Sequence, residues 1–176
     1  MEKTQAVLEN LHTRRSVRAY LPKQVEEGAL QAVLTAGTYA PTGMNRQSPV
    51  IVAVQDAATV AKLSAMNAAV MGTDKDPFYG APAVLVVLAD PEVRTWVEDG
   101  SLVMGNLMNA AHAEGLASCW IHRAREVFDS AEGKALLKEW GLPETLRGVG
   151  NCILGYAAGP LPETRPRKDG YVVRVK

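Results

Sequence analysis

Two kinds of apolar pattern alternate along the chain and predict interleaved strands and helices. Residues 50–55 (VIVAVQ) and 83–89 (AVLVVLA) are almost continuously apolar and rich in β-branched side chains, which is typical of buried strands. In residues 5–13 and 26–40 the apolar positions recur about one helical turn apart, which predicts helices, and a further helix is predicted over 57–70. This interleaving indicates a single domain of the α/β or α+β class.

The helix predicted over residues 100–115 has almost no polar face. Its apolar residues spread around most of the circumference, so we expect it to be buried on most sides. Gly100, Gly105, Ala110 and Ala111 would allow another helix to approach closely, and a second subunit is the simplest source of cover. The other predicted elements are strands over 119–122 and 149–157, a helix over 130–140 and a terminal strand over 171–175.

Length and composition exclude several classes of protein. The chain has 176 residues, of which 47% are hydrophobic, so one folded domain with its own core is expected. Lys plus Arg and Asp plus Glu number 19 each, and this balance favours neither nucleic acid nor a membrane surface as partner. No apolar run approaches the ~18 residues of a membrane span. The N-terminal sequence lacks a hydrophobic signal core, so we expect a cytoplasmic protein.

Positive charge is concentrated in two short clusters near opposite ends of the chain, 14–18 (RRSVR) and 165–168 (RPRK). Arginine presents a planar fork of donors that suits phosphate, and Ser16 adds a hydroxyl donor. If the clusters meet in the fold, they form a phosphate pocket; taken singly, each is equally consistent with a solvated surface. The chain has neither a GxGxxG nor a GxxxxGK[ST] motif, so a Rossmann dehydrogenase or a P-loop enzyme is not expected.

No side chain is nominated as a nucleophile or general base. Cys119 and His122 lie three residues apart, but the cysteine sits in an apolar stretch without a recognised catalytic setting. The cysteines lack CxxC spacing, and three scattered histidines predict no metal site. Acidic pairs such as 98–99 are interpreted as helix starts facing solvent. If the protein is an enzyme, a bound cofactor is expected to supply the chemistry.

Five segments, in this order, resemble the nitroreductase family of FMN-dependent NAD(P)H oxidoreductases. They are 14–18 after a short helix, 40–47 (APTGMNRQ), 78–82 (FYGAP) before an apolar strand, 115–121 (GLASCWI) and 165–168. The resemblance extends from about residue 8 to residue 170. It implies an α+β fold with a mixed sheet flanked by helices, in a single domain spanning residues 1–176. It also implies an intertwined homodimer with an exchanged C-terminal segment, the apolar helix around 104–113 at its centre and two FMN molecules at the interface.

The resemblance also assigns residues to the flavin. The phosphate and ribityl chain would be held by Arg14, Arg15 and Ser16 from one side and by Arg165 and Arg167 from the other.

The flavin ring would be contacted by a second set of residues. Arg18 would reach its pyrimidine edge, where a cation favours hydride acceptance, and Asn67 would hydrogen-bond the ring edge. A loop of the other subunit would pack under the ring, and the main chain of a strand end would lie near N5 and O4. These two segments comprise Pro41, Thr42, Gly43, Asn45 and Gln47 from the loop, and Trp120, Ile121, His122 and Arg123 from the strand end.

The implied activity is a ping-pong transfer of hydride from NADH or NADPH, through the flavin, to a small electron acceptor such as a nitroaromatic or quinone. A specialised reductase or dehalogenase of the same family and a flavin-binding sensor without turnover remain alternatives. The chain departs from the family pattern at 47–49 (QSP) and at 42–43 (TG). It has only residues 91–99 where larger members carry a helical lid, and Trp96 is a candidate lid aromatic with a packing role as the alternative.

Overall fold

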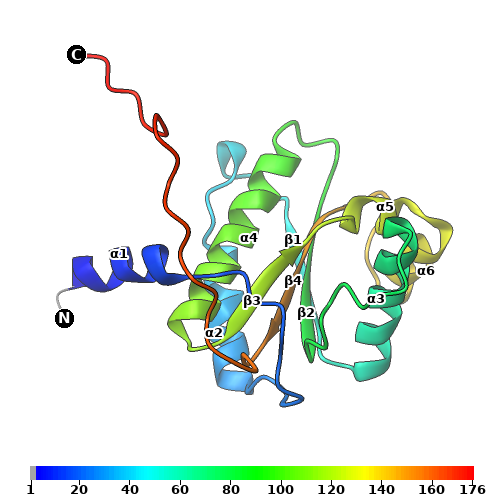
Figure 1. Ribbon diagram of the computed structural model, residues 1–176. Helices are drawn as coiled ribbons and strands as arrows, with labels where there is room; N and C mark the ends of the chain where they lie inside the picture. The colour runs from blue at the N-terminus through cyan, green and yellow to red at the C-terminus, as the bar shows by residue number, and fades with distance from the viewer. Residues whose placement is uncertain (1–2) are drawn as a thin grey trace.

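The computed structural model describes residues 3–176 and contains one four-stranded sheet. The strands run in the order β1-β2-β4-β3, and each neighbouring pair is antiparallel. A single parallel bridge, between Ser16 and Ser118, extends the sheet at the β3 edge. The α+β fold with a helix-flanked sheet is therefore confirmed (Figure 1), but its four strands are antiparallel, whereas the resemblance had implied a mixed sheet. The strands are β1 (Val50–Val54), β2 (Ala83–Ala89), β3 (Ala117–Ile121) and β4 (Arg147–Gly155).

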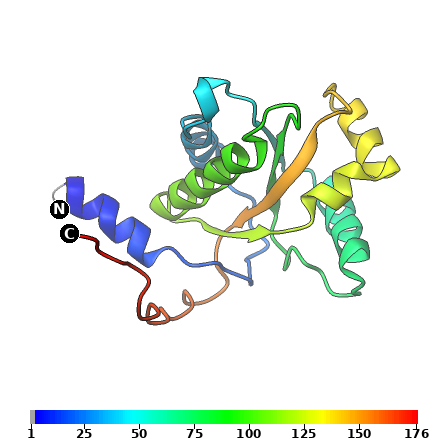
Figure 2. The ribbon, with the colours of Figure 1, turned by 90° about the horizontal axis from the view of Figure 1, so that it is seen from above.

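Helices cover both faces of this sheet (Figure 2). Helices α2 and α4 pack on one face, and α3, α5 and α6 pack on the other, while α1 extends away from the sheet. A short 3₁₀ turn, η1 (Gly43–Asn45), lies between α2 and β1. The helices are α1 (Lys3–Thr13), α2 (Glu27–Thr38), α3 (Ala57–Met71), α4 (Trp96–Ala113), α5 (Ala124–Asp129) and α6 (Ala131–Glu139).

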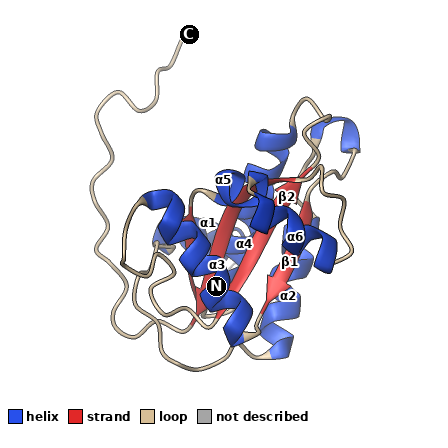
Figure 3. Cartoon of the chain, turned by 90° about the vertical axis from the view of Figure 1, so that its right-hand side faces the viewer, coloured by secondary structure: helices blue, strands red, loops and turns tan. Residues whose placement is uncertain are grey.

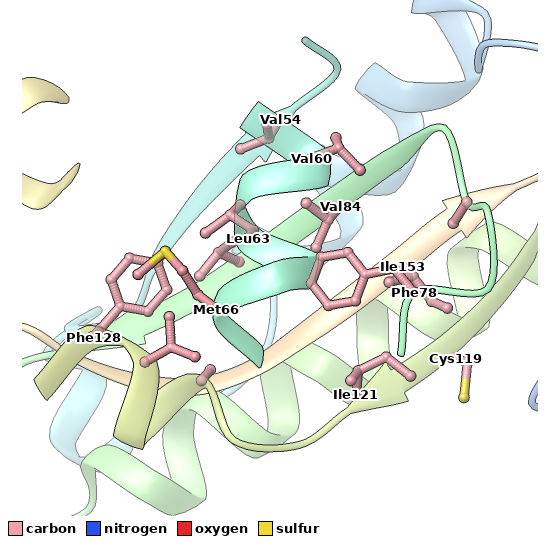
Figure 4. Close-up of a cluster of buried hydrophobic side chains, with 14 of the residues drawn as sticks. Val54, Val60, Leu63, Met66, Phe78, Val84, Cys119, Ile121, Phe128 and Ile153 are labelled. Atoms are coloured by element: carbon pink, nitrogen blue, oxygen red, sulfur yellow. The ribbon is translucent and has the colours of Figure 1, made fainter. Parts of the chain in front are cut away.

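The two central strands divide their side chains between two cores. Along β2, Val84 and Val86 join the core beneath α3, whereas Leu85 and Val87 join the core beneath α4. This division follows from the two-residue period of a strand, and burial on both faces explains why β2 has no polar residue. Figure 4 shows the first core, where Phe128 lies close to side chains of α3.

The second core depends on close helix packing. A Cβ atom at Gly37 of α2 would lie 2.6 Å from Leu107 of α4, so only glycine allows this approach. The prediction that Gly100 faces another helix is wrong, because this residue packs against Val149 of β4. By contrast, a Cβ atom at Gly105 would meet no atom of another element within 4 Å, and Leu102 is exposed on the same helix. One side of α4 is therefore open in the single chain.

Most predicted elements are present within a few residues of their expected limits, with three differences. Helix α4 begins at Trp96, so much of the candidate lid 91–99 is its first turn, and residues 124–129 form a helix that was not predicted. The segment 171–175 is not a strand in the single chain, because no strand lies beside it to accept its hydrogen bonds. Figure 3 shows this C-terminal segment as irregular chain leading away from the sheet.

Both terminal segments present apolar side chains to solvent. Leu8 and Leu11 of α1 are about half exposed, and Val173 and Val175 near the C-terminus are 81% and 93% exposed. Within residues 3–176 nothing covers them. No helix in that range combines the length and apolar character that a membrane span requires.

Candidate functional site

The two basic clusters of the sequence meet in one cavity. It has a volume of about 680 Å³ and lies between the end of α1 and the C-terminal segment. The structure thus confirms that the two clusters are neighbours, although they are about 150 residues apart in the sequence. We call this cavity the arginine pocket; it is lined by Leu11, His12, Arg14, Arg15, Ser16, Glu163, Thr164, Arg165, Pro166 and Arg167.

The N-terminal wall of the arginine pocket is held at both of its ends. Arg14 N–H donates to the carbonyl of Asn10 at 3.1 Å, which continues the last turn of α1. Beyond the arginines, Val17 N–H donates to the carbonyl of Ser118 at 3.0 Å, which joins the segment to the β3 edge. The guanidinium groups are therefore presented from backbone that is fixed on either side.

Charge and hydrogen bonding in the arginine pocket suit an anion. Four guanidinium groups face a single carboxylate, that of Glu163. Arg15 Nη1 donates to the carbonyls of His12 and Arg14, both at 2.7 Å, whereas Arg14 Nη1 is buried without a partner among the described residues. A buried cationic donor without an acceptor is costly, so Nη1 of Arg14 requires a partner that the described residues do not supply.

A second group of predicted residues gathers at the other end of β3. Asn67 is fully buried on α3 and its Nδ2 donates to the carbonyl of His122 at 2.8 Å. Its Oδ1 has no partner among residues 3–176. Arg123 follows in the left-handed region, with φ of 78°, and begins α5. The structure therefore joins Asn67 to the segment 120–123 by a hydrogen bond, a contact that the sequence did not predict.

The loop 41–47 lies apart from both groups. Gly43 N–H donates to Oδ1 of Asp99 at 2.9 Å, and Thr95 Oγ1 donates to Oδ2 of the same carboxylate at 3.0 Å. The loop is therefore attached to the start of α4, and none of its residues lines the arginine pocket. Thr42 and Gln47 instead line a separate cavity of about 330 Å³ beside α2.

Backbone strain is concentrated in the predicted flavin segments. Within residues 3–176, five residues other than glycine have positive φ, and four of them are in the loop 41–47 or at Arg123. Such conformations cost about 1–3 kcal/mol each and cluster at functional sites. This observation is independent of the resemblance and points to the same two segments. The four are Met44, Asn45, Gln47 and Arg123.

Arg18, the pair of Cys119 and His122, and Asp99 lie elsewhere than a single catalytic or phosphate-binding cluster would require. Arg18 is exposed and is not part of the arginine pocket. Cys119 is buried in the first core whereas His122 is exposed, so the structure does not support the pair as a catalytic unit. The interpretation of 98–99 as a solvent-facing acidic pair is wrong for Asp99, which is buried beneath the loop 41–47. An acidic residue in the first turn of a helix is common, so the sequence did not indicate that Asp99 accepts hydrogen bonds from Gly43 and Thr95.

Fold and site together define an α+β protein in which residues 11–16 and 163–167 frame a cavity lined by arginines. The profile of the Nitroreductase family matches residues 11–73 and 69–156. The chain therefore belongs to the nitroreductase family.

Individual relatives agree with this assignment. A protein of Archaeoglobus fulgidus, provisionally named an NADH dehydrogenase/NAD(P)H nitroreductase, is 31% identical over 155 residues, covering 85% of this chain and 84% of the relative. A nitroreductase of Bacteroides fragilis crystallised with FMN is 32% identical, with a TM-score of 0.89 and coverage of 97% of this chain and 98% of that one. One of Desulfitobacterium hafniense, also with bound FMN, has a TM-score of 0.86 at 25% identity and the same coverage.

Proposed function

We propose that this protein is an FMN-dependent oxidoreductase that takes hydride from NADH or NADPH and reduces small electrophiles such as nitroaromatics or quinones. The observation that carries the proposal is the arginine pocket, which is lined by four arginines, one of which, Arg14, has its Nη1 buried without an acceptor among residues 3–176. Relatives with the same fold were crystallised with FMN, which carries a phosphate of about two negative charges. The nicotinamide donor favours action in the cytoplasm.

The residues present fit FMN at both ends of β3. The phosphate would bind among Arg14, Arg15, Arg165 and Arg167, with Ser16 as a further donor. At the other end of the strand, the unpartnered Oδ1 of Asn67 would accept from the flavin ring edge. From Ser118 to His122 the chain spans about 13 Å, which leaves room for the ribityl chain between the two ends.

Bound FMN supplies the hydride chemistry, and the protein contributes position and electrostatics. The cationic pocket fixes one end of the cofactor, and the rigid turn at His122 and Arg123 presents main-chain N–H groups at the other. Arg18 would stabilise negative charge at the pyrimidine edge. The donor and the acceptor would occupy the same face of the flavin in turn, in a ping-pong sequence, with the flavin holding the electrons between the two half-reactions.

The functional form is proposed to be an intertwined homodimer. The exposed apolar residues of α1, the open side of α4 at Gly105 and the apolar C-terminal segment are all surfaces that a second copy would cover. The edge of β1 that faces away from β2 has no strand beside it within residues 3–176 and could pair with the exchanged segment 171–175. In such a dimer the loop 41–47 would reach the partner's flavin.

Visible absorption and flavin binding test the proposal. The purified protein should show a flavin spectrum that bleaches when NADH or NADPH is added without oxygen. Arg14→Met and Arg167→Met should each weaken FMN binding by about 10–100-fold, because a hydrogen bond to a charged group contributes about 1.5–3 kcal/mol. Lys138→Met, which removes one exposed positive charge on α6, is the matched control and should leave the affinity unchanged. Unchanged FMN affinity in both arginine variants would reject the site, and bound flavin that NAD(P)H does not reduce would favour a sensor.

A further inference from the structure

A histidine outside the predicted flavin site contacts the residue that precedes the first arginine of the arginine pocket. His112, in the last turn of α4, has its Nε2 2.8 Å from Oγ1 of Thr13, the residue that precedes Arg14. One turn earlier, Asn10 Nδ2 donates to the carbonyl of Asn109 at 2.9 Å. These two contacts attach the end of α1 to α4, while the apolar residues of α1 remain exposed.

The direction of the contact between Thr13 and His112 follows from counting protons. The hydroxyl of Thr13 is 2.7 Å from the carbonyl of Glu9, and a carbonyl can only accept, so the single hydroxyl proton is used there. Thr13 must then accept from Nε2–H of His112. The remaining ring nitrogen, Nδ1, is the atom that gains or loses a proton. The contact therefore persists in both protonation states, and protonation adds only a positive charge.

That charge would lie beside the guanidinium groups of the pocket. Burial lowers the pKa of His112, and the positive charges of Arg14 and Arg15 lower it further. Across the pocket, Glu163 brings one carboxylate, and Arg165 and Arg167 bring further positive charge. The surroundings of His112 in the single chain are thus cationic, and an anion bound by Arg14 and Arg15 would reverse much of their effect.

We propose that His112 is a positioning residue that couples proton uptake to the binding of a phosphate group in the arginine pocket. This inference rests on the proposed function, since it takes the FMN phosphate as the anion. Once the phosphate neutralises Arg14 and Arg15, the protonated ring is no longer repelled, and the imidazolium adds attraction of its own. Because coupling between two sites is reciprocal, protonated His112 strengthens phosphate binding as much as the phosphate strengthens protonation.

The direction of the pH effect follows. The pKa of His112 lies below its ordinary value in the free protein and rises when the phosphate binds, so FMN affinity gains as pH falls through that interval. The phosphate itself has a second pKa of about 6 and loses charge over a similar range, which weakens binding. This opposing effect belongs to the ligand and is the same for every variant of the protein.

His112→Gln separates the two effects, because the amide keeps an N–H donor for Thr13 but does not titrate. The dissociation constant of FMN is measured by quenching of flavin fluorescence at about pH 5.5 and pH 8, for wild type and His112→Gln. At each pH we divide the dissociation constant of His112→Gln by that of wild type. This ratio should be about fivefold larger at pH 5.5 than at pH 8, which is a typical coupling between linked sites. A ratio that does not change with pH would overturn the proposal.

A second measurement follows His112 itself. The chain has three histidines, so their ring signals can be resolved by NMR, and His112→Gln identifies one of them. The protein is titrated with FMN bound and with riboflavin bound, which has the same ring but no phosphate. The midpoint of His112 should be higher with FMN; equal midpoints would contradict the coupling. Thr13→Ser should behave as wild type, whereas Thr13→Val should weaken FMN binding at both pH values.

Failure of the inference and failure of the proposed function give different results. If FMN binds and depends on Arg14 and Arg167, but the midpoint of His112 does not respond, only the coupling is rejected. If FMN binding does not depend on the arginines, the assignment of the pocket is itself wrong.

Discussion

The sheet with its five covering helices differs from the two terminal segments in how far its apolar side chains are buried. On both faces of the sheet, apolar side chains are buried within the single chain, and β2 is covered completely. In α1 and the C-terminal segment, comparable apolar residues are exposed, yet these are the segments that frame the arginine pocket. The sheet is therefore packed within one chain, whereas the segments that frame the arginine pocket are those that the proposed dimer would cover.

The largest change in the free energy of unfolding should come from a substitution in the core between the sheet and its covering helices. Phe128 of α5 is fully buried and packs against Trp140 with ring centroids 5.8 Å apart. Phe128→Ala should lower the free energy of unfolding by about 3–5 kcal/mol, since it removes a large apolar side chain and leaves a cavity. Urea denaturation at fixed FMN concentration measures this. Phe128→Leu should cost clearly less, and equal losses for the two variants would show that packing is not the cause.

A smaller effect on folding, but a larger one on assembly, is expected at the C-terminal segment. Val173→Asp combined with Val175→Asp should raise the dimer dissociation constant on the order of a hundredfold, because each buried valine contributes about 1.5–3 kcal/mol. Sedimentation over a dilution series gives this constant, and circular dichroism checks that the sheet is retained. Arg174→Gln, on the opposite side of an extended segment, is the control. A dimer unaffected by the paired change would contradict the exchanged segment.

The smallest effect is expected from a surface ion pair in the part formed by the sheet and its covering helices. Arg147 Nε donates to Oδ1 of Asp129 at 2.9 Å, and a second bond joins Nη2 to Oδ2. The hydrogen bond from Arg147 holds the pKa of Asp129 below its ordinary value, with Coulomb attraction adding to it. A carboxylate whose pKa is lowered in the folded state stabilises the fold at pH values above its ordinary pKa. This stabilisation is lost as the pH falls through the lowered pKa.

Asp129→Asn should therefore cost less than about 1 kcal/mol at pH 7, because both side chains are partly exposed, and almost nothing at about pH 3. Urea midpoints at the two pH values measure the difference. FMN affinity should not change, since the pair lies outside the predicted site. Asp169→Asn in the C-terminal segment is the control for a general effect of charge, and a loss that persists at low pH would show that the pair is not its source.

Much of the fold was predictable because buried strands and helices require apolar residues at regular spacings in the sequence. Strand β2 was predicted at its observed limits, since burial on both faces allows no polar residue to blur them. Helix α5 was missed because six residues are too few to show a helical period. The first turn of α4 was missed because Trp96 to Asp99 mixes apolar and acidic residues whose burial is decided by the loop 41–47 packed against them.

For the site, the sequence supplied residues but not their arrangement. Two basic clusters were visible, while their meeting became an expectation only through the resemblance and was confirmed by the fold. The strained backbone at Met44 and Arg123 left no trace, because neither residue is the glycine that such φ values favour. The contact between His112 and Thr13 was equally invisible, since it joins residues 99 positions apart by a single hydrogen bond.

The placement of the two walls of the arginine pocket also bears on synthesis. One wall consists of residues 11–16, which are held by contacts to α4 and β3, and the other consists of residues 163–167, which follow β4. Domains fold as they leave the ribosome, so the sheet can form while the pocket still lacks half of its cations. A prematurely terminated product that ends after β4 would keep a folded core and would have no complete phosphate site. Binding of the proposed cofactor would therefore require residues 163–167 in addition to the folded sheet.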